Sequence, residues 1–323
     1  MNPTVSVLLP AYNAARFIDQ TIESVVGQTF SDWELVAVDD VSSDATFERL
    51  QDWTLREPRL RLFRNETNRG MTANWNRCLE EARGTYIVKL DADDAFRPKT
   101  LEVLVNAMSA DDIVGAGVRT LRCTEADLEP FDGQPADDAM INAGFNPYED
   151  QTRGCDRWYN LAALGNQLWH SCGYIVRREF LQRRAFDERF GCCSDTEMIL
   201  RMLECEGRFV HNAYVGVLYR QVQGSISHQF QANNWRTWEG CVVLLLSISR
   251  AHRARLLPRS VMTRYAQLWN RWRHFRGSAE FEKVIPPAIR ERLDSAMSEV
   301  PPPPWTDRAI CRARQTASRL LRG

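Results

Sequence analysis

The chain has 323 residues, 44% of them hydrophobic and 26% charged, with a formal net charge of −1. This length and composition exclude a miniprotein and are ordinary for a globular protein with ample core. The nine scattered cysteines contain no CxxC pair, which excludes a zinc-finger spacing and predicts buried thiols in a reducing compartment. No signal peptide is expected, and the longest apolar run, Val242 to Leu246, is too short to span a bilayer. We therefore expect a cytoplasmic protein.

Strands and helices are predicted to alternate over the first hundred residues. Apolar and β-branched runs predict four strands, at Val5–Leu9, Glu34–Val38, Arg59–Phe63 and Tyr86–Leu90. Helical spacing predicts helices over Arg16–Gln28, from near Asp44 with Ser42 or Ser43 as cap, over Met71–Ala82, and after Pro98. This alternation is typical of an α/β protein with a mostly parallel central sheet wound with helices.

Polar residues follow three of these predicted strands. They are Tyr12-Asn13 after the first, Asp39-Asp40 after the second, and Asp91-Ala92-Asp93-Asp94 after the fourth. Ligands of wound α/β sheets bind outside the carboxyl ends of the strands. We therefore expect these three groups to converge on one site.

The acidic stretch from Asp91 to Asp94 is a candidate metal site. Clustered carboxylates raise one another's pKa unless a cation neutralises them. Mg²⁺ and Mn²⁺ prefer carboxylate oxygens, together with the phosphate oxygens of a substrate. The alternative is a solvated turn in which Asp94 caps the helix that Pro98 opens.

The middle of the chain contains a second candidate functional residue, a carboxylate at the start of a predicted helix. A helix is predicted after Cys192-Cys193, with Met198, Ile199, Met202 and Leu203 on its apolar face and Gly207 at its end. Asp195 lies in its first turn, where the helix dipole favours an ionised carboxylate. The alternative is that Asp195 only caps this helix. Phe209 to Tyr219 is predicted as a pair of strands.

Five segments resemble the inverting family 2 glycosyltransferases of the GT-A fold. They are VSVLLPAYN at 5–13, QTFSDWE at 28–34, VDDVSSD at 38–44, NRG at 68–70 and LDADD at 90–94. The resemblance is strong over residues 1 to 110 and thinner to about 228. It implies an enzyme that moves a sugar from a nucleotide sugar, expected to be a UDP sugar, to a hydroxyl of a glycan or lipid-linked acceptor.

The resemblance also implies roles for individual residues. Asp40 would accept the uracil N3–H, Asp91 would lie near the ribose or phosphates, Asp93 would ligate Mn²⁺ or Mg²⁺, and Asp195 would be the catalytic base. Residues expected to bind the nucleotide sugar are Pro10, Ala11, Tyr12, Asn13, Asp40, Asn68, Gly70, Asn76, Asp91, Ala92 and Asp93. Trp169, His170 and Arg201 are candidates for acceptor contact.

The chain departs from the family pattern at several positions. Val41 stands where the family usually has Gly, and Ser194 stands where it has Glu before the catalytic Asp. The Asn74-Trp75-Asn76 segment occupies a helix face where many members carry a small residue and Arg. A loop histidine is absent at Val222, with His228 nearby. The change at Ser194 supports an alternative, a catalytically inactive protein that binds nucleotide sugars.

The C-terminal part is basic. Residues 250–323 carry 16 basic and 6 acidic side chains, a balance of +10, against 25 basic and 36 acidic (−11) before them. Helical spacing covers Trp235–His274, and Pro301–Pro304 predicts a stiff spacer before a basic amphipathic helix at Ala309–Leu321. This extension either packs on the body or contacts an anionic membrane.

We therefore expect three parts: residues 1–110 as the nucleotide-sugar-binding half of the GT-A domain, 111–232 as the acceptor and catalytic-base half, and 233–323 as the helical basic extension. Other α/β enzymes fit less well. A dinucleotide-dependent oxidoreductase needs GxGxxG after the first strand, and a sugar nucleotidyltransferase needs a Gly-rich basic loop there; Pro10-Ala-Tyr-Asn-Ala-Ala15 is neither. We expect no nucleic-acid partner and leave homo-oligomer formation open.

Overall fold

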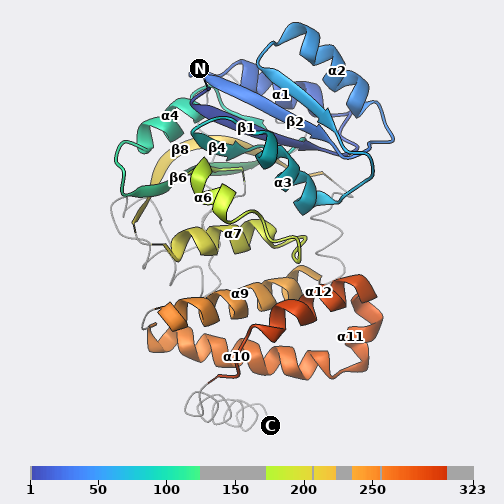
Figure 1. The fold of residues 1–323 in the computed structure, drawn as a ribbon, viewed down its shortest axis with the longest axis vertical. Coiled ribbons are helices and arrows are strands. Elements are labelled where there is room, and N and C mark those ends of the chain that lie inside the picture. The colour runs from blue at the N-terminus through green and yellow to red at the C-terminus, as the bar shows by residue number, and fades with distance from the viewer. Residues whose placement is uncertain (1, 124–171, 206, 223–234, 255–256, 304–323) are drawn as a thin grey trace. The chain divides into compact units, whose positions relative to one another are not determined.

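The computed structural model describes residues 2–123, 172–205, 207–222, 235–254 and 257–303 (Figure 1). The chain divides into two compact units. Unit 1 comprises residues 1–155, 168–186 and 205–223, and unit 2 comprises 156–167, 187–204 and 224–323. Trp169, His170, His228 and the predicted helix at Ala309–Leu321 lie outside the described residues.

The described strands of unit 1 form an eight-stranded sheet. Its strands are β1 (Val5–Ala11), β2 (Trp33–Asp39), β3 (Leu60–Arg64), β4 (Tyr86–Lys89), β5 (Ala95–Phe96), β6 (Ile113–Cys123), β7 (Tyr174–Arg177) and β8 (Arg208–Arg220), in the order β3-β2-β1-β4-β7-β6-β8-β5. The first four are mutually parallel, and β8 is parallel to β6. Strands β7 and β5 run antiparallel to their neighbours. The four strands predicted in the first hundred residues are confirmed, and so is the mostly parallel sheet.

Helices cover both faces of this sheet (Figure 1). They are α1 (Ile18–Val26), α2 (Thr46–Arg56), α3 (Met71–Glu81), α4 (Thr100–Ala107) and α6 (Arg178–Arg183). Side chains alternate along β1. Val5, Val7 and Leu9 join one core cluster with the buried faces of α1, α2 and α4. On the other face, Ser6 Oγ accepts the backbone N–H of Gly84, directly after α3 and its following turn, at 2.7 Å.

One predicted element in unit 1 is wrong. The segment from Phe209 to Tyr219, expected to be two strands, is the single strand β8. Gly216 does not turn the chain. A Cβ there would lie 2.7 Å from Val118 Cγ2, so the glycine is needed for the close approach of β8 to β6.

Unit 2 is helical. Its elements are α7 (Ser194–Leu203), α9 (Trp235–Ala254), α10 (Arg259–Arg276), α11 (Ala279–Val284) and α12 (Pro287–Ser298). The helical spacing predicted over Trp235–His274 is confirmed as α9 and α10, and Pro258 is the N-cap residue of α10. Gly207 does not end α7, since that helix stops at Leu203. Within the described ranges, no helix is long and apolar enough to cross a membrane.

Candidate functional site

The loops that follow β1 and β2 are joined by hydrogen bonds. The backbone N–H of Asn13 donates to Ser42 Oγ at 2.9 Å, and Asn13 Oδ1 accepts the backbone N–H of Ser43 at 2.8 Å. Asn13 adopts φ 50°, a left-handed conformation that Asn tolerates well. The expected capping role of Ser42 or Ser43 is wrong: Ala45 is the N-cap residue of α2, and both serines hold Asn13 instead.

Tyr12 projects from this pair of loops. It is 48% exposed, one of the two large hydrophobic residues classed as exposed among those the structure describes, and it directly follows buried Ala11 at the end of β1. Pro10, one residue earlier, is partly buried. An exposed aromatic ring at the carboxyl end of a central strand offers a flat apolar surface on which a planar base can stack.

Asp40 is buried, with 2% of its surface exposed, and anchors the loop before α3. Its Oδ1 accepts hydrogen bonds from Asn65 Nδ2 at 2.7 Å and from the Arg69 backbone N–H at 2.8 Å; its Oδ2 accepts the Gly70 N–H at 2.9 Å. Asn68 Nδ2 donates to the Asp40 carbonyl at 3.1 Å. A carboxylate has about four acceptor positions. Asp40 therefore fixes the loop and keeps one position of Oδ2 for a further donor.

Val41 follows Asp40 in a strained backbone conformation. Its φ is 61°, in the left-handed region, where a β-branched residue is a genuine outlier. Asp39, the residue before Asp40, is fully buried and pairs with Arg64 Nε at 3.0 Å. The two buried carboxylates that precede Val41 thus hold this turn, and Val41 carries its backbone strain.

The acidic stretch after β4 is built around Lys89. This lysine is 2% exposed, pairs with Asp91, and has its Nζ 4.1 Å from the centroid of the Trp75 ring. Burial alone would lower the pKa of Lys89, but the negative charge of Asp91 outweighs it and the pKa is raised. Cys172 donates its thiol to Asp91 Oδ2 at 3.2 Å. Asp91 is therefore held by a buried cation on one side and a thiol on the other.

Asp94 is fully buried beneath this cluster. Its Oδ1 accepts the Arg220 backbone N–H at 3.0 Å, and its Oδ2 accepts the Cys172 thiol at 3.5 Å. Burial and the charges of Asp93 and Asp91 raise its pKa well above the ordinary value. The alternative in which Asp94 caps the next helix is wrong, because the N-cap residue of α4 is Lys99 and has no side-chain cap.

Asp93 has the chemistry of a cation ligand. Burial, together with the neighbouring charge of Asp91, raises its pKa to about 6. The Asp93 backbone N–H donates to its own carboxylate and partly opposes this shift. Asp91, Asp94 and Cys172 also offer ligand atoms that lie within 4.8 Å of one another. A hard divalent cation would relieve the repulsion among these acids, so the residues present fit Mg²⁺ or Mn²⁺. Ala92, between the acids, is buried and its carbonyl accepts Thr21 Oγ1 at 3.0 Å.

Two asparagines of α3 have structural partners. Asn76 donates through Nδ2 to the Phe186 carbonyl and accepts the Phe186 N–H through Oδ1, both at 2.9 Å. Asn74 donates to the Val38 carbonyl at 3.0 Å. Both side chains are buried. Asn76, expected to bind the nucleotide sugar, is therefore engaged in holding the Phe186 segment against α3.

The candidate base belongs to unit 2. Asp195 is the second residue of α7, whose N-cap residue is Cys193, so the alternative in which Asp195 caps the helix is wrong. Ser194 is fully buried and its hydroxyl donates to the Phe190 carbonyl at 2.9 Å. Arg201 Nε pairs with Glu197 at 2.7 Å, one turn earlier on the same helix.

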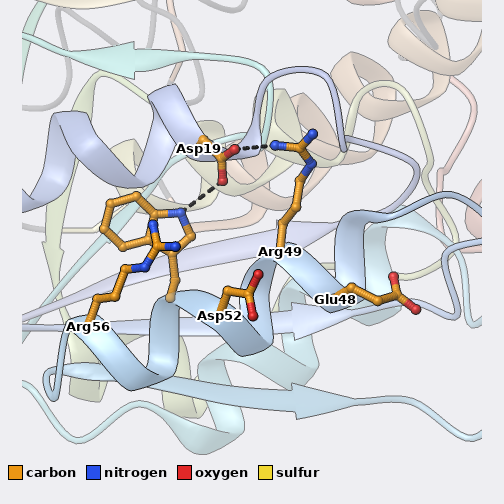
Figure 2. Close-up of a pocket in the computed structure, with 6 residues that line it drawn as sticks. Asp19, Glu48, Arg49, Asp52 and Arg56 are labelled. Carbon is orange, nitrogen blue, oxygen red and sulfur yellow. Dashed lines mark hydrogen bonds and ion pairs between the residues drawn. The ribbon is translucent and has the colours of Figure 1, made fainter.

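A separate pocket of about 320 Å³ lies between α1 and α2 (Figure 2). Figure 2 shows Asp19 pointing toward Arg49. Asp19 Oδ1 also accepts a hydrogen bond from Trp53 Nε1 at 2.9 Å. The pocket is lined by Asp19, Glu48, Arg49, Asp52, Trp53 and Arg56. None of these belongs to the predicted site.

Sequence analysis did not identify three residues that contact or neighbour the acids Asp91 to Asp94: Lys89, Cys172 and Arg220. Lys89 was the one that could have been found, because a lysine in an apolar strand two residues before Asp91 shares its face of the sheet. Cys172 and Arg220 reach the cluster only through the tertiary fold.

Comparisons with known proteins agree with this architecture. Residues 6–164 match the family model "Glycosyl transferase family 2". A putative glycosyltransferase, EpsE of Bacillus subtilis, is 35% identical over 120 residues, which cover 36% of this chain and 43% of EpsE. The succinoglycan biosynthesis protein ExoO of Rhizobium meliloti is 31% identical over 243 residues, covering 70% of this chain and 63% of ExoO. The matched segments thus span less than half of EpsE and less than two thirds of ExoO.

Solved structures share the fold at low sequence identity. S. aureus TarS 1–349 in complex with UDP-GlcNAc has a TM-score of 0.63 and 18% identity, with 93% of this chain and 82% of that chain covered. A mannosyltransferase from Pyrobaculum calidifontis in complex with GDP-Man and Mn²⁺ has a TM-score of 0.55 and 19% identity, with 99% of this chain and 81% of that chain covered. The comparisons lead to one conclusion: the chain contains a glycosyl transferase family 2 domain over residues 6–164, and it shares the GT-A fold of the solved structures.

Proposed function

We propose that this protein is a metal-dependent inverting glycosyltransferase. It would move a sugar from a nucleotide sugar, a UDP sugar in particular, to a hydroxyl of a glycan or lipid-linked acceptor. The reaction would serve the synthesis of a surface polysaccharide or glycoconjugate, in the cytoplasm. TarS was solved with UDP and with UDP-GlcNAc, and ExoO is named for succinoglycan biosynthesis, which supports both the donor class and the product class.

The observation that carries this proposal is that the Asp93 carboxylate and the exposed Tyr12 ring follow the neighbouring parallel strands β4 and β1 of one sheet. A group of acids with raised pKa values at a strand end is costly in the free protein, and a dication with a diphosphate removes that cost. Tyr12 and the remaining acceptor position of Asp40 offer stacking and a hydrogen bond to a uracil. Together these groups suit a nucleoside diphosphate.

Each part of the chain has a proposed task. Residues 1–110 bind the nucleotide sugar, 111–232 supply the acceptor site and the catalytic base, and 233–323 form the extension. Asn68 and Gly70 act through the loop that Asp40 holds. Trp169, His170 and Arg201 remain candidates for acceptor contact, and Asp91 for contact with the ribose or phosphates.

The chemistry would be a single displacement at the anomeric carbon. Asp195 accepts the proton of the acceptor hydroxyl, and the oxygen attacks from the face opposite the nucleotide. Lys89 and Arg220 place positive charge beside the acids and would favour the departing diphosphate. A bound dication would stabilise the charge of that leaving group by several kcal/mol.

Asp93→Ala tests the metal site. We expect loss of Mn²⁺-dependent UDP binding in calorimetry, because a buried carboxylate with a raised pKa is removed from the acidic cluster. Asp52→Ala, in the pocket between α1 and α2, is the control and should bind as the natural protein does. Unchanged Mn²⁺-dependent affinity in Asp93→Ala would place the metal on other residues.

Asp195→Asn tests the base. The change keeps the size and helix position of the side chain but removes its basicity. We expect donor binding to persist and the transfer rate to fall by at least about a hundredfold. Turnover close to that of the natural protein would mean that another residue accepts the proton.

Ser194 favours a second candidate, a nucleotide-sugar-binding protein without catalysis. The family's Glu is absent there, and the buried hydroxyl is used by the Phe190 carbonyl. Release of nucleoside diphosphate from a panel of nucleotide sugars, with and without polysaccharide acceptors and Mn²⁺, separates the two. Acceptor-dependent release supports the enzyme, whereas stoichiometric binding with no release supports the binding protein.

A further inference from the structure

Unit 2 contains a second cluster of potential metal ligands, formed by Cys192, Cys193 and Glu239. The two cysteines directly precede α7, and Glu239 lies on α9, which packs against α7. The ligand atoms of the three side chains lie within 4.8 Å of one another. The proposed transfer reaction uses none of these residues.

Glu239 is a buried carboxylate without a cationic partner among the described residues. It is 5% exposed, and the three donors to its carboxylate are all neutral. Oε1 accepts the Gly191 N–H at 2.6 Å, while Oε2 accepts the Cys193 N–H at 2.9 Å and the Cys192 thiol at 2.6 Å. Burial raises its pKa. A buried acid held only by neutral groups is an expensive arrangement, and a cation nearby would lower its cost.

The two thiols have the spacing of a tetrahedral site. Cys192 Sγ and Cys193 Sγ are 4.0 Å apart. Two thiolates on one zinc ion, with Zn–S bonds of about 2.3 Å at a tetrahedral angle, would be about 3.8 Å apart. Cys193 is buried, but Cys192 is partly exposed and gives an ion access from solvent. The set of two sulfurs and one oxygen suits a thiophilic cation, in contrast with the carboxylates around Asp93.

We propose that Cys192, Cys193 and Glu239 bind a thiophilic divalent cation, with Zn²⁺ as the biological ion. Binding forms two Zn–S bonds and one Zn–O bond, and the two thiol protons leave to solvent. The Cys192 thiol then no longer donates to Glu239, whose Oε2 turns to the ion. A fourth position is left for water. Since Cys193 is the N-cap residue of α7, the ion ties the start of that helix to α9.

The test uses the full-length, reduced protein under anaerobic conditions and Co²⁺ as a spectroscopic probe. Tetrahedral Co²⁺ with thiolate ligands gives a charge-transfer band and strong visible absorption. We expect one equivalent to produce this spectrum and Zn²⁺ to abolish it. Cys192→Ser and Cys193→Ser should each lose the charge-transfer intensity, and Glu239→Gln should weaken binding by about tenfold or more.

Two single-thiol controls separate this site from others. Cys205→Ser removes a cysteine of similar exposure, and Cys172→Ser removes the thiol beside Asp91 and Asp94. Both should keep the Co²⁺ spectrum. Because a cysteine variant can fail to fold, alkylation of the natural protein is mapped in parallel by mass spectrometry, and Zn²⁺ should protect Cys192 and Cys193. A natural protein without thiolate charge transfer, or protection at other cysteines instead, would overturn the proposal.

Discussion

At the scale of single residues, Val41 is the position where the chain departs most clearly from an unstrained backbone. Its φ of 61° costs a β-branched residue about 1–3 kcal/mol. The side chain is only partly buried, so little apolar contact offsets this cost. The neighbouring bonds of Asp39 and Asp40 impose the conformation, because both carboxylates are tied to segments distant in sequence.

Replacing Val41 should therefore stabilise the protein. We expect Val41→Gly to raise the free energy of unfolding by about 1 kcal/mol, after allowing for the greater freedom of glycine in the unfolded chain. Val41→Asn should stabilise less, and Val41→Ala least, because alanine keeps a Cβ in the left-handed region. Urea unfolding of the four proteins gives the order. A destabilised glycine variant would mean that the contacts of the valine side chain outweigh its backbone strain.

At the scale of elements, the pairing of β6 with β8 encloses a histidine. His211 of β8 is 1% exposed and lies in register with Gly117 of β6. A Cβ at Gly117 would lie 3.3 Å from the imidazole Cδ2, so the glycine makes room for the ring. Burial lowers the pKa of His211 to about 4, and the nearby Arg119 adds to the shift, although the contact of Nδ1 with the Asn212 carbonyl opposes it.

This histidine predicts an acid-sensitive contribution to stability. The pKa of His211 is near 6.5 in the unfolded chain but about 4 in the folded chain, so folding favours the neutral imidazole. The contribution of His211 to stability is therefore fully present above pH 6.5 and is lost as the pH falls toward 4. Between pH 7 and pH 5 the loss from this group is about 2 kcal/mol. In urea unfolding, the free energy of unfolding of His211→Gln should fall by about 2 kcal/mol less between pH 7 and pH 5 than that of the natural protein. The control His252→Gln, at an exposed position of α9, should show the same pH dependence as the natural protein. Equal pH slopes in all three proteins would contradict the prediction.

The same scale explains what the sequence could predict. Strands β1 to β4 carry periodic apolar patterns, and acids after a strand end must lie at the edge of a parallel sheet, so the core and Asp91 to Asp94 could be located. The hydrogen-bond partners of those acids could not be predicted from the sequence. Asp94 is held by the backbone of Arg220, 126 residues later, and Asp40 by backbone N–H groups of Arg69 and Gly70. Backbone donors have no signature in residue type, so only the tertiary fold reveals them.

At the scale of the whole molecule, the unexplained feature is the charge difference along the chain. The surplus of +10 in residues 250–323 lies partly on exposed positions of the helices α9 and α10 and partly in the sequence beyond Pro303. The helices also bury apolar side chains: Trp238 stacks on Phe275 with ring centroids 3.5 Å apart. Packing within unit 2 thus accounts for the extension up to about residue 303, and the last twenty residues need another explanation.

We expect these last residues to bring the protein to an anionic membrane surface. Arg312, Arg314, Arg319 and Arg322 alternate with apolar residues, and each basic side chain near an anionic bilayer contributes about 1 kcal/mol. The full chain should sediment with vesicles that contain anionic lipid at low salt and be released as salt is added. A chain shortened after Pro303, which keeps the hydrogen bond from the Tyr265 hydroxyl to the Pro301 carbonyl, should bind UDP but no longer sediment.

A matched pair of charge variants decides whether position or total charge is responsible. Arg312→Gln with Arg314→Gln removes two charges from the last residues, and Arg253→Gln with Arg259→Gln removes two from exposed positions of unit 2. Because surface attraction falls off within a Debye length of about 8 Å at physiological salt, only charges carried at the bilayer contribute fully. The first pair should lower vesicle binding about tenfold or more, and the second should leave it nearly unchanged. Equal losses of vesicle binding in both pairs would mean that the basic surface as a whole binds the membrane. If the full-length protein does not sediment with vesicles at low salt, the last twenty residues serve packing or oligomer formation instead.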